Sequence, residues 1–189
     1  MASSLRIRRA VLTDASAIDS LLSEWLPSKP DAGRLRSIKT ATRNREMLVA
    51  QDQERTIGFI HYVKHEDVID GGPNTFVTAF YVSPRFRGKG IGGLLLDSMI
   101  RDSLTMGAVG VETSTIHKLA KKLYERHHFK QTMGDIGEVF LELDIPEYLK
   151  AKKRRPSSKT SFRCLCKSRW SPSSGSPRPE PHRGPLSMV

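Results

Sequence analysis

The stretch RFRGKGIG at residues 85–92 combines three glycines with basic side chains directly before an apolar run. Backbone N–H groups in such a loop, together with the N-terminus of a following helix, bind anions such as phosphate. Glycine suits these positions because a Cβ would keep the phosphate away from the backbone. The stretch therefore predicts a phosphate-binding loop. Its contacting residues are predicted to be Arg87, Gly88, Lys89, Gly90, Ile91 and Gly92.

Two other kinds of phosphate site compete for this interpretation. The P-loop pattern G-x-x-x-x-G-K-[ST] does not occur in the chain. The dinucleotide pattern G-x-G-x-x-G does occur, at Gly88, Gly90 and Gly93, and Glu112 follows about where an acid would bind the ribose. However, that pattern normally opens its domain, whereas about 80 residues precede it here. A dinucleotide-binding protein is therefore kept as an alternative.

Hydrophobic periodicity predicts the elements that must position this loop. Strands are predicted at 5–9, 47–51, 56–62, 75–82, 108–113, 129–133 and 139–143. Helices are predicted at 14–25, 31–45, 90–106 and 116–127, and Asp97 and Arg101 are spaced to pair on the third of them. The run 75–82 is almost entirely apolar, which predicts a central strand buried on both faces after a loop at 64–74. This order indicates an α/β fold with antiparallel strands first and one β-α-β unit around the glycine loop.

The C-terminal segment differs in composition from the rest of the chain. From Lys150 onward there are 11 lysines and arginines against one acid, Glu180, so this segment carries almost all of the net charge of +11. It is rich in Ser and Pro and has no apolar periodicity, so it cannot bury enough surface to offset its chain entropy. We therefore predict a domain at 1–149 and a disordered basic tail at 150–189. The tail could contact nucleic acid or an anionic surface.

Cysteine usage and hydropathy bound the location and the class of protein. The two cysteines, Cys164 and Cys166, have no distant partner, so no disulfide framework is expected. Two thiols are also too few for a structural zinc site, and no metal is expected. No apolar run approaches the roughly 18 residues of a membrane span, and the N-terminus lacks the apolar region of a secretory signal. The expected location is the cytoplasm.

The segment Arg85-x-x-Gly88-x-Gly90 resembles the R/Q-x-x-G-x-G/A pyrophosphate loop of the GNAT superfamily of acetyl-CoA-dependent N-acetyltransferases. The resemblance covers roughly residues 5–144. The stretch IRRAVLTDASAIDSLL is similar to the first strand and helix of the family, and VETSTIHKLAKKLYERHHF resembles its pattern E-x4-N-x2-A-x3-Y-x4-F. The implied fold is a mixed, mostly antiparallel twisted sheet flanked by helices, with a central β-α-β unit that binds acetyl-CoA.

The chain departs from the family pattern at two positions. His117 stands where the family often has Asn, which affects one expected contact to acetyl-CoA. His128 stands where the family usually has Gly, at a position that commonly ends a helix in the left-handed conformation. Histidine tolerates that conformation better than most residues, so a slightly strained turn is expected there and not a different fold.

The resemblance implies direct acetyl transfer from acetyl-CoA to a primary amine. The backbone of Phe80, Tyr81 and Val82 is expected to bind the pantetheine arm, and a backbone N–H of that strand the acetyl oxygen. Tyr124 matches the general acid of the family, which protonates the leaving thiolate. Glu112, which we expect to end its strand and to face the same cleft, is the candidate base, because an amine near pH 7 is mostly protonated. Three further acids are held in reserve as the base: Glu66, Asp67 and Asp70.

The acceptor is not specified by the sequence. It is expected between the loop after residue 25 and the acidic loop at 66–70, and it is a small molecule or a protein amine. The oligomeric state is open, with a homodimer among the partners considered. A non-catalytic acyl-CoA-binding module is the other alternative, but it would need neither Glu112 nor Tyr124.

Overall fold

The computed structural model describes residues 5–26, 32–68, 71–134 and 138–154. Seven strands form one sheet in the order β1-β2-β3-β4-β5-β7-β6. All neighbouring strands are antiparallel except the β4–β5 pair, which is parallel. The strands are β1 (Arg6–Arg9), β2 (Met47–Asp52), β3 (Arg55–Asp67), β4 (Gly72–Val82), β5 (Gly110–Thr115), β6 (Lys130–Met133) and β7 (Val139–Asp144). The predicted mixed, mostly antiparallel sheet with one β-α-β unit is therefore confirmed.

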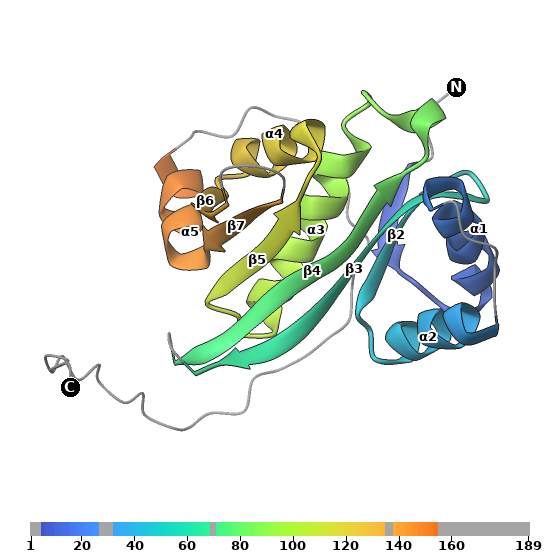
Figure 1. The fold of residues 1–189 in the computed structure, drawn as a ribbon, viewed down its shortest axis with the longest axis horizontal. Coiled ribbons are helices and arrows are strands. Elements are labelled where there is room, and N and C mark those ends of the chain that lie inside the picture. The colour runs from blue at the N-terminus through green and yellow to red at the C-terminus, as the bar shows by residue number, and fades with distance from the viewer. Residues whose placement is uncertain (1–4, 27–31, 69–70, 135–137, 155–189) are drawn as a thin grey trace, which may run out of the picture. The chain divides into compact units, whose positions relative to one another are not determined.

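Helices cover both faces of this sheet (Figure 1). Helices α1 (Ala15–Trp25) and α2 (Ala32–Arg43) pack on one face, over β2, β3 and β4. Helices α3 (Ile91–Thr105), α4 (Lys118–Arg126) and α5 (Ile145–Arg154) cover the other face. Each face has its own apolar core, and the larger core, under α3, contains Leu95, Leu96, Met99 and Ile100, all fully buried. No helix of the described ranges is long and apolar enough to cross a membrane.

The long β3–β4 hairpin differs from the prediction. β3 continues to Asp67 and β4 begins at Gly72, so most of the loop expected at 64–74 is paired strand. The strands there are polar, and ladder hydrogen bonds stabilise them where apolar burial does not. β4 is also not buried throughout, because Thr78 is exposed. Thr78 is the extra residue of a bulge, since its neighbours Val77 and Ala79 pair with the consecutive β3 residues Tyr62 and His61.

Helix α5 was not among the predicted elements, which ended with the strand at 139–143, and Pro146 is its second residue. Proline is compatible with the first turn of a helix, whose N–H groups have no intrahelical partner. Ile145 and Tyr148 of α5 are buried in the larger core. The Tyr148 hydroxyl donates to Asp97 Oδ1 at 3.2 Å, so Asp97 of α3 contacts α5. The predicted pair of Asp97 and Arg101 does not form, and Arg101 donates to Ser98 instead.

The boundary of the C-terminal segment also moves. Helix α5 runs to Arg154, five residues into the segment that composition assigned to the tail. The rest of that segment, 155–189, lies outside the described residues, so the disordered tail stays a prediction. The turn at His128 is confirmed, since its φ of 70° is in the left-handed region.

Candidate active site

Strands β4 and β5 pair over only four residues and then separate (Figure 1). The parallel ladder runs from Asn74 and Gly110 to Val77 and Thr113, whereas β4 continues to Val82 and β5 to Thr115. The bulge at Thr78 directly follows the last pair, and a bulge bends its strand and increases the local twist. The result is an opening in the sheet whose apex lies at Val77 and Thr113.

The β4 side of this opening presents backbone hydrogen-bonding groups. The Ser83 N–H donates to the Ile57 C=O at 3.0 Å, and the register places Tyr81 opposite Phe59. Ser83 and Ile57 therefore form a hydrogen-bonded pair. Such pairs recur at every second residue of an antiparallel ladder, so Tyr81, two residues before Ser83, also directs its backbone groups to β3. Phe80 and Val82 direct theirs away from β3, toward the opening. Of these groups, the Val82 C=O accepts a hydrogen bond from Arg87 Nε at 2.8 Å.

The glycine loop follows β4 and ends at the N-terminus of α3. Gly88 and Gly90 have φ values of 75° and 79°, a conformation that L-residues with a Cβ rarely adopt. Gly90 is the N-cap, and the first intrahelical bond runs from the Leu94 N–H to the Gly90 C=O. The N–H groups of the preceding first turn, from Ile91 to Gly93, have no intrahelical acceptor. A loop of this kind followed by a helix N-terminus can bind an anion, and phosphate binding by residues 87–92 stays a prediction.

Two basic side chains of the loop, Arg87 and Lys89, lie over aromatic rings. The Arg87 guanidinium is 5.2 Å from the centre of the Tyr81 ring, and the Lys89 amine is 5.3 Å from that of Phe86. Gly92 has a packing role, because a Cβ there would be 3.2 Å from Leu123 Cδ2 of α4. Its lack of a side chain lets α3 lie close to α4 at the opening.

Tyr124 lies under the apex of the opening, on the face covered by α3 and α4. Its hydroxyl is 3.5 Å from Thr113 Oγ1, and its ring packs against Phe80 and Phe129 at centroid distances of 6.3 and 5.2 Å. Burial raises the pKa of the Tyr124 hydroxyl above its usual value, although the Thr113 hydroxyl acts in the opposite direction. The group is therefore protonated at neutral pH and can serve only as a proton donor there.

Glu112 lies on the other face of β5, which corrects the prediction that it shares one cleft with Tyr124. It is the third residue of β5 and not the last, and side chains alternate along a strand, so Glu112 and Thr113 point to opposite sides. Its side chain is 32% exposed, accepts a hydrogen bond from Asn74 Nδ2 at 2.7 Å and lies 3.9 Å from His65 Nε2. We call this side of β5 and β7, which carries Glu112, Ser114, Phe140 and Glu142, the open face; these side chains are partly or fully exposed.

The remaining predicted residues lie at the two ends of the β4–β5 ladder, with His117 beyond the end of β5 on the side of the opening and the reserve acids that the structure describes at the opposite end. His117 is the N-cap of α4, with an exposed side chain and a backbone N–H that donates to Thr115 Oγ1 at 3.1 Å. Of the reserve acids, Glu66 and Asp67 are the last residues of β3, whereas Asp70 lies outside the described residues. Asp67 is close to the open face, because Asn74 Nδ2 also donates to its Oδ2 at 3.2 Å.

Asn74 and Thr113 were missed by the sequence analysis, although each contacts a predicted catalytic residue. Asn74 is 1% exposed and lies inside a strand, where Asn is depleted. A polar residue in a strand interior signals a partner or a function, but Asn74 falls in the loop predicted at 64–74, so this signal appears only once the strand is known. Thr113 gave no such signal, since Thr is common in strands.

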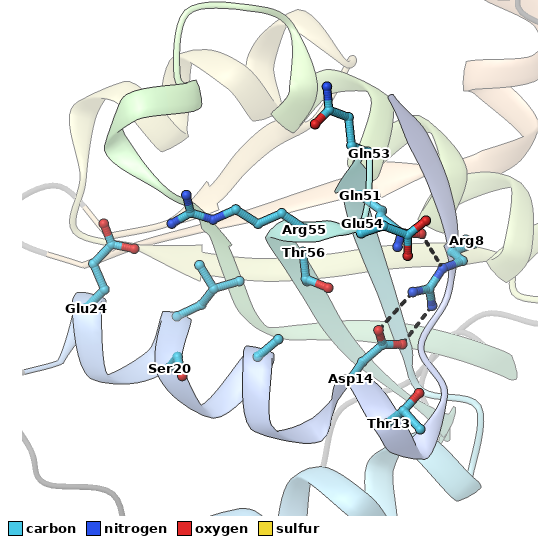
Figure 2. Close-up of a pocket in the computed structure, with 12 residues that line it drawn as sticks. Arg8, Thr13, Asp14, Ser20, Glu24, Gln51, Gln53, Glu54, Arg55 and Thr56 are labelled. Atoms are coloured by element: carbon cyan, nitrogen blue, oxygen red, sulfur yellow. Dashed lines mark hydrogen bonds and ion pairs between the residues drawn. The ribbon is translucent and has the colours of Figure 1, made fainter. Parts of the chain in front are cut away.

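A hollow of about 840 Å³ lies between α1 and the β2–β3 hairpin and contains none of the predicted site residues. Figure 2 shows that polar side chains line it, with Arg8 and Asp14 joined at its edge. Their bidentate ion pair, at 2.7 and 2.8 Å, connects β1 to the start of α1. Burial favours a higher pKa for the Asp14 carboxyl, but the hydrogen bonds from Arg8 and the Val11 N–H outweigh it and lower that pKa. This pair explains local structure and adds no catalytic group.

Comparisons with known proteins identify the family of this chain. The sequence pattern of the Acetyltransferase (GNAT) family matches residues 15–129. A mycothiol acetyltransferase of Propionibacterium freudenreichii is 35% identical over 96 residues, which are 48% of this chain and only 30% of that protein. An uncharacterized N-acetyltransferase of Bacillus subtilis, YhfO, is 27% identical over 75% of this chain and 99% of its own length.

Solved structures share the fold at lower identity. An N-acetyltransferase from Staphylococcus aureus Mu50 has a TM-score of 0.63 and 22% identity, over 76% of this chain and 99% of that one. The aminoglycoside N-acetyltransferase AAC(6')-Iy in complex with CoA has a TM-score of 0.65 and 21% identity, over 72% and 94%.

Proposed function

Because the chain belongs to the acetyltransferase (GNAT) family, we propose that it transfers the acetyl group of acetyl-CoA directly to a primary amine. The observation that carries the proposal is the opening between β4 and β5. Backbone groups that are directed away from β3 line one side of it, a glycine loop and a helix N-terminus lie at its outer end, and a buried tyrosine hydroxyl lies at its apex.

The residues present fit acetyl-CoA. The pantetheine arm carries amide groups, and it can add to the free edge of β4 as a strand adds to a sheet. Phe80 and Val82 supply that edge, whereas Tyr81, which was expected to contribute, has its backbone groups paired with β3. The pyrophosphate fits the loop from Arg87 to Gly92, because Gly88 and Gly90 have positive φ angles and the first turn of α3 offers N–H groups without an intrahelical acceptor. Acetyl-CoA supplies the activated acyl group as a thioester.

The two proposed catalytic side chains act from opposite faces of the sheet. Glu112 accepts a proton from the acceptor amine on the open face, directly or through water. Tyr124 donates a proton to the departing CoA sulfur from the helix-covered face. A backbone N–H on the free edge of β4 stabilises the negative charge that develops on the acetyl oxygen. Because β4 and β5 are not paired beyond Val77 and Thr113, the reacting bond is proposed to lie between the two groups.

The acceptor is proposed to be a cationic amine that approaches the open face. Glu112 and Glu142 are cross-strand neighbours there, and Asp67 lies within hydrogen-bond reach of the same Asn74 amide that holds Glu112. Carboxylates favour an ammonium group over a neutral or anionic acceptor. Cytoplasmic location, a homodimer and nucleic-acid binding by the tail stay predictions from sequence.

The experiment is a screen that follows free thiol release from acetyl-CoA. The amines are 1,4-diaminobutane, kanamycin, a peptide with a free N-terminus and a blocked peptide with one lysine. Amine-dependent thiol release, with acetylated product by mass spectrometry, is the expected result. Binding of acetyl-CoA without transfer to any amine would favour the non-catalytic module, and binding of NAD in its place would favour the dinucleotide alternative.

A further inference from the structure

Asn74 occupies a central position between two carboxylates of the acceptor side. It lies on β4, with His65 of β3 on one side and Gly110 of β5 on the other. Its Nδ2 donates to Glu112 Oε1 at 2.7 Å and to Asp67 Oδ2 at 3.2 Å. One buried amide therefore connects three strands through side chains that are 7 and 38 residues away along the chain.

The orientation of this amide is fixed by its surroundings. Both N–H groups are directed to carboxylates, which can only accept while ionised. The carbonyl, Oδ1, faces Gly110, where an added Cβ would lie only 3.0 Å from it. Among the described residues Oδ1 has no hydrogen-bond donor although it is buried. An apolar residue would avoid that unsatisfied group, so stability alone does not account for Asn at this position.

The contact also distinguishes the two oxygens of Glu112. Oε1 receives the Asn74 N–H and is the oxygen nearest to His65 Nε2. Within the described ranges no donor contacts Oε2, and Glu112 is partly exposed. The carboxylate is thus held through one oxygen while the other is available to accept a proton.

We propose that Asn74 is a positioning residue of the reaction, which holds Oε1 of Glu112 so that Oε2 is presented to the acceptor amine. The inference rests on the proposed function, because it requires Glu112 to act as the base. Asp67 takes the second N–H of the amide and prevents its rotation, and Gly110 provides the space for its carbonyl. Asn74 itself does not contact the reacting atoms.

A double-mutant cycle tests this role with the amine of the panel that the wild-type protein acetylates fastest. Asn74→Ala is expected to lower kcat about ten- to hundredfold, because misplacement of a catalytic group costs rate. The KM for acetyl-CoA should stay within about twofold, since the cofactor contacts are not touched. In the Glu112→Gln background, Asn74→Ala should reduce kcat by less than about twofold further, because the group that it positions is already lost.

The matched control is Thr75→Val. Thr75 is the next residue of β4, is fully buried and has a hydroxyl without a partner among the described residues, but it faces the opposite side of the strand. Its replacement should leave kcat within about twofold. If Asn74→Ala does not fold, Gly110→Ala provides a second perturbation, because its Cβ displaces the Asn74 carbonyl and should lower kcat in the same way.

Three results would overturn the inference. If the kcat losses of Asn74→Ala and Glu112→Gln multiply fully in the double mutant, Asn74 acts independently of Glu112. An Asn74→Ala variant, or Gly110→Ala in its place, with wild-type kcat would show that Glu112 needs no support. Transfer to none of the amines by the wild-type protein would remove the proposed function and this inference together, whereas the first two results leave acetyl transfer intact.

Discussion

Glu112 and Tyr124 lie on opposite faces of strand β5. The Glu112 carboxylate is hydrogen-bonded to Asn74 on the open face, and the Tyr124 hydroxyl lies beside Thr113 on the face under α3 and α4. Because Glu112 and Thr113 are consecutive, their side chains lie on opposite faces, and the carboxylate and the tyrosine hydroxyl therefore lie on either side of one strand. This arrangement suits a reaction in which the amine and the leaving thiolate are on opposite sides of the transferred acetyl group.

Tyr124→Phe should lower kcat by about 10²- to 10⁴-fold, because it retains the buried ring and removes the proton donor. Calorimetry should show CoA affinity within about threefold of wild type. Burial raises the pKa of Tyr124, so the wild-type rate should show no loss from its ionisation up to about pH 10. An active Tyr124→Phe would mean that the thiolate departs without this acid.

Glu112→Gln should slow the reaction more at pH 7 than at pH 9. The substitution keeps the shape of the side chain and removes its basicity. More of the acceptor amine is already neutral at the higher pH, so less help from a base is needed. Rate profiles of both proteins over this range decide the point, and a pH-independent loss below about threefold would assign the proton transfer to water or another carboxylate.

Gly90→Ala should weaken CoA binding by at least about tenfold, because alanine strongly disfavours a φ of 79°. Gly93→Ala is the matched control. Its added Cβ would meet the His127 ring at 3.5 Å, an ordinary contact, and its φ is not positive. Equal CoA affinities of the two variants, measured by calorimetry, would show that the left-handed conformation is not what the site requires.

A chain that ends at Arg155 should keep its stability and its kcat within about twofold, because that residue closes the compact unit containing the site. A chain that ends at Asp144 should instead unfold at a much lower temperature. It loses Ile145 and Tyr148, which are 2% and 4% exposed, and burial of one large apolar side chain is worth about 2–5 kcal/mol. Thermal unfolding of the two truncated chains makes the comparison, and equal stability would contradict the assigned role of α5.

Local sequence predicted the parts of the site that depend on local structure. The glycine loop, the N-terminus of α3 and the left-handed turn at His128 all follow from backbone preferences of a few residues. The face on which Glu112 lies did not follow, because it depends on where α4 packs relative to β5. The contact of Asn74 with Glu112 joins residues 38 positions apart, which no local pattern reports. Helix α5 was missed because its charged sequence resembles the tail, and only its contacts with the core distinguish it.

The central claim is that acetyl-CoA lies in the opening between β4 and β5 with its sulfur near Tyr124. A crystal structure of the protein with CoA measures this directly. We expect pantetheine amides hydrogen-bonded to the backbone of Phe80 and Val82, the pyrophosphate against the first turn of α3, and the sulfur within hydrogen-bond reach of the Tyr124 hydroxyl. CoA bound outside the opening, or with its sulfur far from Tyr124, would contradict the account.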